Sequence, residues 1–140
     1  MIAALKRNPA LAIVFVLAVL LVAGVLTFAG PCAHEDGSHG TCYDTSLFLV
    51  GIGCVAAVAA VAALVVRVRF ASGALSVVAA LAGALAALAP GSLLPLCMMA
   101  TMRCWTVMRP FAMACGIAIF VCGVVGAVRA FKERGKASRA

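Results

Sequence analysis

The chain has 140 residues, of which 66% are hydrophobic and 11% are charged, and its net charge is +7. Soluble domains are only roughly half apolar, so a mean hydropathy of +1.23 excludes an ordinary soluble fold and predicts a membrane protein. The basic residues lie at the edges of apolar runs, which indicates membrane topology and argues against a nucleic-acid partner.

Four apolar runs each approach the ~20 residues that a helix needs to cross the hydrocarbon core of a bilayer. They are residues 10–29, 47–66, 71–89 and 111–130. Backbone groups in lipid must be hydrogen-bonded inside the protein, and a helix does this within its own segment. Nothing in these runs alternates as the strands of a β-barrel do. We therefore expect an all-α fold, a single integral membrane four-helix bundle.

The basic residues predict how the bundle is oriented. Nine of the eleven lie in three clusters, which are Lys6 and Arg7, then Arg67 and Arg69, and finally Arg129, Lys132, Arg134, Lys136 and Arg139. Positive charge collects on the cytoplasmic side of membrane proteins. We therefore expect both termini, including the basic tail 131–140, to be cytoplasmic, and the loops 30–46 and 90–110 to face outward.

The first apolar run has an alternative interpretation as a secretory signal peptide that is cleaved after Ala29. Lys6 and Arg7 precede it, as in such signals. The run is longer than the usual signal core of ~7–15 apolar residues, which favours a retained helix.

Small residues dominate the second and third runs and recur as glycines in the fourth, which favours close helix packing in lipid. The short link at residues 67–70 makes the second and third helices antiparallel neighbours. No charged residue lies inside the runs away from their ends, so the usual markers of an ion or proton path are missing. We expect no enzymatic activity and no transport by this chain alone.

The loops hold four of the seven cysteines, namely Cys32, Cys42, Cys97 and Cys104. Disulfides persist on the oxidising side of a membrane, and four cysteines allow three pairings. If residues 97–104 were helical, their two cysteines would stand roughly 10 Å apart. That exceeds the ~7 Å that a bridge allows between α-carbons, and bridges between the loops would be favoured. If they form a loop, each loop can close its own bridge.

A soft-metal site is a second interpretation of the loops. Thiolate and thioether ligands select Cu(I), whereas thiolate with imidazole suits zinc or copper. The candidate ligands are His34, His39, Cys97, Met98, Met102 and Cys104. Their spacing matches no paired zinc pattern, and Met also fills helix ends without a metal. We predict no cofactor, and Cu(I) is the metal that this set would prefer.

Thiol–disulfide exchange is a third interpretation, in which a nearby arginine lowers the pKa of Cys104. The sequence contains no CxxC motif, which argues against it. Arg103 and Arg109 break the positive-inside pattern and are candidates for binding an anion or a lipid headgroup. The alternative is that they snorkel to the interface or pair with acidic residues of the first loop.

The segments "PCAHEDGSHGTC" and "LCMMATMRCWTVMRP" give the chain a resemblance to a family of small four-span bacterial membrane proteins described only as a domain of unknown function. Its members resemble one another in a "CMMxTMRC" signature before the last helix. The signature is matched here by Cys97, Met98, Met99, Thr101, Met102, Arg103 and Cys104. The family often has histidine where this chain has Trp105, and that departure weakens a metal site that would use it. The resemblance implies a bacterial inner-membrane location and an accessory role beside an ABC transporter.

Taken together, these patterns predict a structural or accessory subunit of a larger membrane complex, with an outer cap clasped by cysteines. The lipid bilayer and a membrane-protein partner or a second copy of the chain are the expected contacts. The alternative is an outward-facing Cu(I) or thiol-redox protein that uses the loop cysteines.

Overall fold

The structure, a computed structural model, describes residues 9–28, 41–66, 68–94 and 104–137. These residues form four long helices, α2 (Pro9–Thr27), α3 (Thr41–Val65), α4 (Arg69–Leu88) and α5 (Arg109–Ala137). Two short elements, η1 (Ala89–Leu93) and η2 (Cys104–Met108), lie next to the end of α4 and the start of α5. No strand occurs within the described ranges, so the expected all-α fold is confirmed.

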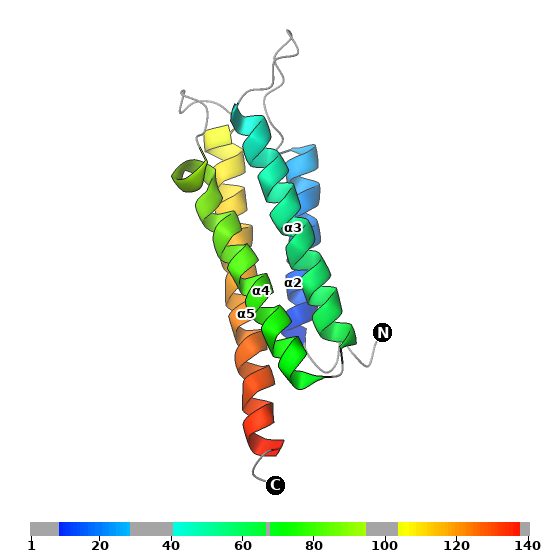
Figure 1. The fold of residues 1–140 in the computed structure, drawn as a ribbon. Coiled ribbons are helices and arrows are strands. Elements are labelled where there is room, and N and C mark those ends of the chain that lie inside the picture. The colour runs from blue at the N-terminus through cyan, green and yellow to red at the C-terminus, as the bar shows by residue number, and fades with distance from the viewer. Residues whose placement is uncertain (1–8, 29–40, 67, 95–103, 138–140) are drawn as a thin grey trace.

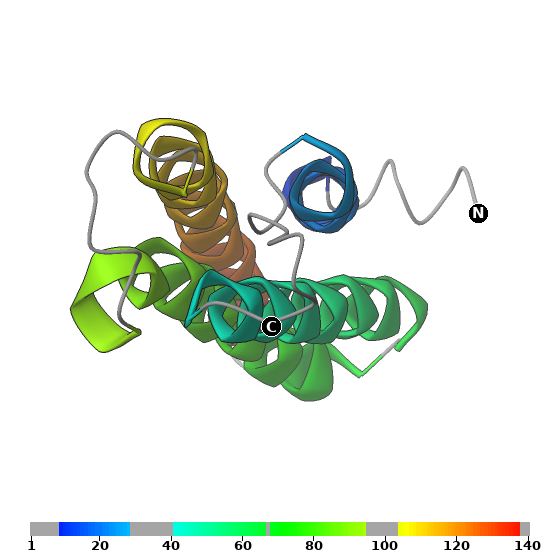
Figure 2. The same ribbon diagram turned by 90° about the horizontal axis from the view of Figure 1, so that it is seen from above.

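The four long helices run up and down and close into a ring. Each packs against the helix before and after it in the chain, and α2 also packs against α5, which closes the bundle. Figure 1 shows that the start of α2 and the end of α5 lie at the same end, which we call the tail end. The starts of α3 and α5 lie at the opposite end, which we call the cap end (Figures 1 and 2).

Four helical stretches, two of which include η1 or η2, are long and apolar enough to cross a membrane, namely Pro9–Thr27, Cys42–Val65, Phe70–Leu93 and Trp105–Lys132. Large apolar side chains face outward along their length. Examples are Val16, Val58, Leu81 and Val128, each more than half exposed. Such a surface is compatible with lipid and not with water, so the chain is a multi-pass membrane protein.

Helix α3 begins earlier than the apolar run from 47 predicted, and it includes residues 41–46, which we expected in a loop. Cys42, Thr45 and Leu49 lie on one face at helical spacing and are all buried, so polar residues continue the buried stripe. Asp44 lies in the first turn, where a negative charge interacts favourably with the helix dipole. Hydropathy alone does not detect such a helix start.

The tail end also differs from expectation, because α5 continues to Ala137 through most of the predicted tail 131–140. Ala, Lys, Arg and Glu are strong helix formers, and basic residues suit the last turns of a helix. The basic tail is therefore largely an extension of α5.

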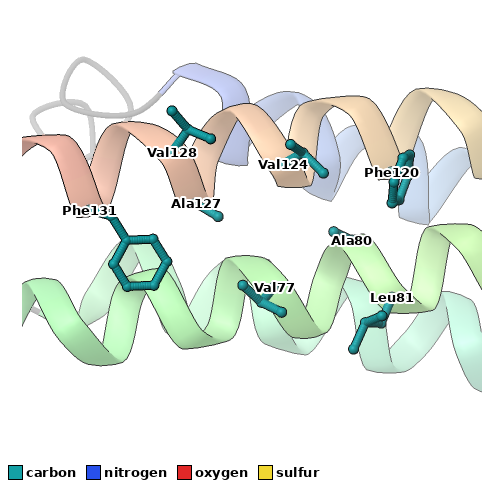
Figure 3. A pocket seen from close by; sticks show the side chains of 8 residues that line it. All are labelled: Val77, Ala80, Leu81, Phe120, Val124, Ala127, Val128 and Phe131. Atoms are coloured by element: carbon teal, nitrogen blue, oxygen red, sulfur yellow. The ribbon is translucent and has the colours of Figure 1, made fainter.

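The closest helix contact joins α4 to α5, where small residues allow backbone to approach backbone. A Cβ built on Gly123 would lie 2.9 Å from the Cα of Ala80, and one built on Gly83 would lie 2.6 Å from the backbone nitrogen of Phe120. Figure 3 shows Ala80 and Ala127 directed toward the space between the two helices. Without a hydrophobic effect between helices in lipid, such packing supplies much of the attraction.

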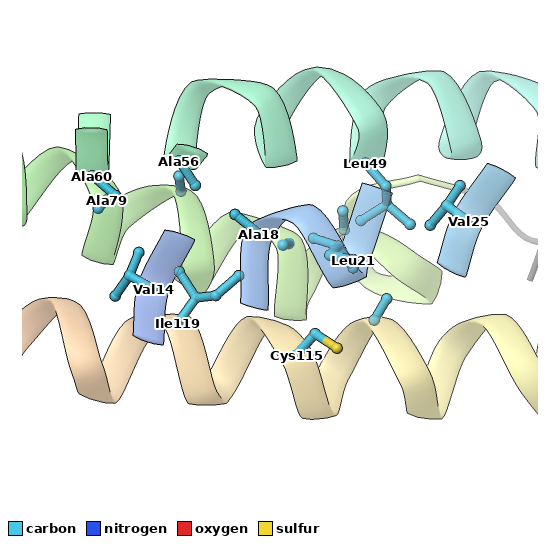
Figure 4. Close-up of a cluster of buried hydrophobic side chains, with 14 of the residues drawn as sticks. Val14, Ala18, Leu21, Val25, Leu49, Ala56, Ala60, Ala79, Cys115 and Ile119 are labelled. Carbon is cyan, nitrogen blue, oxygen red and sulfur yellow. The ribbon is translucent and has the colours of Figure 1, made fainter. Parts of the chain in front are cut away.

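The core lies where α2 meets the other three helices (Figure 4). Its largest fully buried side chains include Leu11, Leu21, Leu49 and Ile119, and alanines fill most of the remaining space. Helix α2 supplies several of these residues, so the first apolar run is an integral part of this bundle. Within the described residues, no buried side-chain nitrogen or oxygen lacks a hydrogen-bond partner.

Candidate functional site at the cap end of the bundle

The cap end carries the candidate functional residues that the structure describes. Cys42 lies in the first turn of α3, while Trp105, Met108 and Arg109 lie in η2 and at the start of α5. The remaining candidates, namely Cys32, His34, His39, Cys97, Met98, Met102 and Arg103, lie outside the described residues. Cys104 begins η2, but its side chain also lies outside them.

Cys42 is a free thiol with 1% of its surface exposed. It is one of the four described thiols that are free in this structure, the others being Cys54, Cys115 and Cys122. Its position in the first turn of α3 buries its side chain on the face that carries Thr45 and Leu49. The predicted involvement of Cys42 in a cap disulfide therefore stays a prediction.

Met108 is fully buried at the end of η2, directly before α5, and joins the same core cluster as Cys42. Trp105 packs against this cluster while remaining partly exposed. Sequence reasoning placed Met108 in the loop 90–110 without assigning it a role. The spacing that links it to Ala112 and Cys115, both buried on α5, was the signal that could have shown its burial.

Arg109 is held over the ring of Trp105, with the guanidinium carbon 4.7 Å from the ring centroid. This is the geometry of a cation–π contact. The two residues are four apart, so one turn of helix brings them together. Arg109 is only half-buried, which leaves its guanidinium partly open to the surface. A stacked and partly exposed arginine beside a tryptophan suits a membrane interface, where both residue types gather.

The end of α4 is shaped by a tight turn through Pro90 and Gly91. Pro90 has φ −73° and ψ 109°, and Gly91 has φ 86° and ψ −7°, close to the two central positions of a type II turn. Gly91 must adopt a positive φ, which glycine does without steric cost. The backbone N–H of Leu94 donates to the carbonyl oxygen of Ala89 at 3.0 Å and closes the wider loop that contains this turn.

An aromatic contact links α2 to α5 near the same end. The rings of Phe28 and Phe111 meet edge to face, with centroids 5.0 Å apart and planes at 71°. Gly24, one turn before Phe28, leaves the space that the Phe111 ring occupies. The contact holds the first helix against the last one beside the cap.

The chemistry of the cap end is described by only a few side chains. Among the described residues, no three His, Cys, Asp or Glu side chains are grouped to hold a metal ion. The described groups include a buried thiol, a buried thioether, a stacked arginine and, in the first turn of α3, the side chains of Tyr43 and Asp44. The thioether can pack, the thiol can form a disulfide and the arginine can bind an anion. The side chains of the other loop cysteines and of both histidines lie outside the described residues.

Comparisons with known proteins identify the family. No curated protein and no solved structure matches the chain. Residues 14–129, which include parts of all four long helices and the whole cap end, match the family described as a domain of unknown function, DUF4418. The chain belongs to this family of domains of unknown function, as its resemblance in sequence predicted.

Proposed function

We propose that this protein is a structural or accessory subunit of a larger membrane complex, such as an ABC transporter, and that it has no enzymatic activity. The observation that carries this proposal is Gly51 on α3. A Cβ built on Gly51 would have nothing within 4 Å, although this residue lies in the middle of a membrane-spanning helix. The described glycines of α2 and α4, by contrast, each face another helix or a side chain closely.

An exposed glycine in a helix needs a reason, because it costs about 1 kcal/mol relative to alanine. In membranes the common reason is a close-packed partner helix. Gly51 and the exposed Cys54 form a small-residue notch on a face that also carries Leu47, Val58 and Val65. These five residues recur at spacings of three, four or seven, as in the seam of two packed helices. This face is the proposed docking surface for the partner.

The proposed orientation has both termini in the cytoplasm and the cap end outside, in the inner membrane of a bacterium. Support comes from the basic residues, since Arg129 and Lys132 are exposed at the tail end and Lys6 and Arg7 precede α2. The cap is proposed to be clasped by disulfides among Cys32, Cys42, Cys97 and Cys104. Clasping would hold the two outer segments of the chain against the bundle.

Affinity capture tests the role as a subunit. The tagged protein, extracted in a mild detergent from its own host, is expected to retain the subunits of one transporter in constant ratio, as identified by mass spectrometry. Gly51→Leu should abolish retention by filling the notch. Val121→Leu, at an exposed position on α5, is the matched control and should not change it. Retention that survives Gly51→Leu, or the absence of any partner, would contradict the proposal.

The second candidate function is an outward-facing Cu(I) or thiol-redox site at the cap. It is favoured by the buried sulfur atoms of Cys42 and Met108 at the cap end, and by the sulfur-rich sequence that leads from Cys97 to Met108. A copper site should lose its metal in Met98→Leu and Met102→Leu variants whose helical content is unchanged. An accessory subunit should tolerate both substitutions and keep its partner.

A further inference from the structure

A second feature of the surface, on α4 and α5, is independent of the docking face on α3. An apolar groove of ≈ 310 Å³ runs between these helices in the half of the bundle nearer the tail end. Figure 3 shows the side chains that line it. We propose that this groove binds one acyl chain of an anionic phospholipid, whose headgroup lies against the basic residues at the end of α5.

The shape of the groove follows from the close packing of the two helices. Ala80 and Ala127 form its floor and are 5% and 7% exposed. Larger side chains stand along both sides, from Val77 and Leu81 on α4 and from Val124 and Val128 on α5. A floor of methyl groups between branched walls leaves a channel that follows the helix seam.

Two phenylalanines bound the groove along its length. Phe120 lies toward the cap end and Phe131 toward the tail end, and both are partly exposed. Phe131 reaches across to α4, where a Cβ on Gly73 would lie 3.1 Å from its ring (Figure 3). Gly73 therefore provides the space that lets this ring cross the seam near the membrane surface.

The lining and the size of the groove suit a hydrocarbon chain. All of its lining residues are apolar. A methylene group is similar in size to a water molecule, whose share of liquid volume is ~30 Å³. The groove therefore accommodates on the order of ten methylenes, a large part of one acyl chain. A partner helix, by comparison, would have to pass over the protruding Phe120 and Phe131.

Positive charge at the end of the groove nearer the tail end of the bundle favours a negatively charged headgroup. Lys132 is exposed and lies one helical turn beyond the groove residue Val128, whereas Arg129 is exposed on the side of α5 away from the groove. The sequence Arg129–Lys136 contains four basic residues and one acid. A phosphate at the membrane surface is thus attracted to the position where its acyl chain enters the groove. Zwitterionic lipids lack the net negative charge that would use this attraction.

Native mass spectrometry of the full chain in detergent tests the site. Phosphatidylglycerol and phosphatidylcholine with identical acyl chains are added in equal amounts. We expect one retained lipid, with phosphatidylglycerol preferred. Lys132→Gln should reduce that preference by about fivefold, and Arg129→Gln, on the side of α5 away from the groove, should reduce it less. Ala127→Leu fills the floor and should reduce retention of both lipids at least fivefold, while Val125→Leu, an exposed α5 position outside the groove, serves as the control.

Several results would overturn the inference. Equal retention of the two lipids by the wild type would contradict selection of an anionic headgroup. Unchanged lipid retention in Ala127→Leu would contradict binding in the groove. A wild-type dimer that Ala127→Leu converts to a monomer would show that a second copy occupies it. If circular dichroism shows that Ala127→Leu is misfolded, Val77→Phe is used instead, because it fills the groove from its exposed wall. Lipid retention that is unchanged in Val77→Phe would then contradict binding in the groove.

Discussion

Gly83 of α4 and Gly116 of α5 lie directly against each other's backbone. A Cβ built on Gly116 would be 2.7 Å from the carbonyl oxygen of Gly83, and a Cβ built on Gly83 would be 2.8 Å from the carbonyl oxygen of Gly116. Because the opposing atoms belong to backbone, no side-chain rotation can make room. The short distance between the two helix backbones therefore requires glycine at both positions.

Gly116→Ala is expected to force the two helices apart and to lower the free energy of unfolding by about 1–3 kcal/mol, the usual cost of overpacking. Unfolding of the purified protein in mixed micelles with increasing dodecyl sulfate, followed by circular dichroism, measures the change. Gly51→Ala is the matched control, since nothing lies within 4 Å of its Cβ position. It should be neutral or stabilising by up to about 1 kcal/mol. Equal losses in both variants would contradict the tight packing at Gly116.

Two serines on α4 provide a second comparison. The hydroxyl of Ser72 donates to the carbonyl oxygen of Ala63 on α3 at 3.1 Å, and that of Ser76 donates to the carbonyl oxygen of Ser72 within its own helix at 2.8 Å. Ser72→Ala removes a bond between helices and should cost about 0.6 kcal/mol, the average for such bonds in membranes, and at most about 1.7 kcal/mol. Ser76→Ala should cost less in the same assay, and the reverse order would argue against the α3–α4 bond.

The Trp105–Arg109 contact can be followed by fluorescence, because Trp105 is the only tryptophan in the chain. Arg109→Gln removes the cation that stands over the ring and should change both the wavelength and the intensity of emission. It should cost about 0.5–1 kcal/mol in stability, as expected for a partly exposed cation–π pair. Lys132→Gln at the opposite end is the control and should leave the emission spectrum unchanged. An identical spectrum for Arg109→Gln would show that the stacked geometry is not populated.

The sequence predicted the four spans and the all-α fold well because hydropathy is a strong signal over twenty residues. It predicted element ends less well. Residues such as Thr41, Cys42 and Thr45 resemble a loop by hydropathy, yet they lie in the first five residues of α3 because Cys42 and Thr45 complete a buried stripe. The basic residues after Ala130 suggested a separate tail, whereas their helix propensity extends α5.

The candidate site was harder to predict, since side-chain burial depends on how the helices meet. The sequence identified Arg109 but not its stacking on Trp105, which depends on η2 leading directly into α5. It identified small residues but could not show that Gly83 and Gly116 are packed while Gly51 is open. That distinction requires the register between helices, which composition does not contain.

The cap cysteines give the last prediction. If Cys32, Cys42, Cys97 and Cys104 form two disulfides, the intact protein should lack the mass of four hydrogens, and alkylation under denaturing conditions before reduction should modify three of the seven cysteines. Cys42→Ser should then release one additional thiol, and mapping that thiol identifies its partner. Cys54→Ser, at an exposed position inside α3, is the control and should only lower the number of alkylated thiols by one.

The free thiol of Cys42 in this structure makes the opposite result informative. Seven alkylated cysteines in protein purified without reductant would contradict the clasp. In the folded protein, the 1% exposure of Cys42 should then make it react far more slowly than in the denatured protein. A retained mass of one copper ion together with seven thiols would move the Cu(I) alternative ahead of the structural cap. The same sample therefore separates a covalently closed cap from a buried, reduced one.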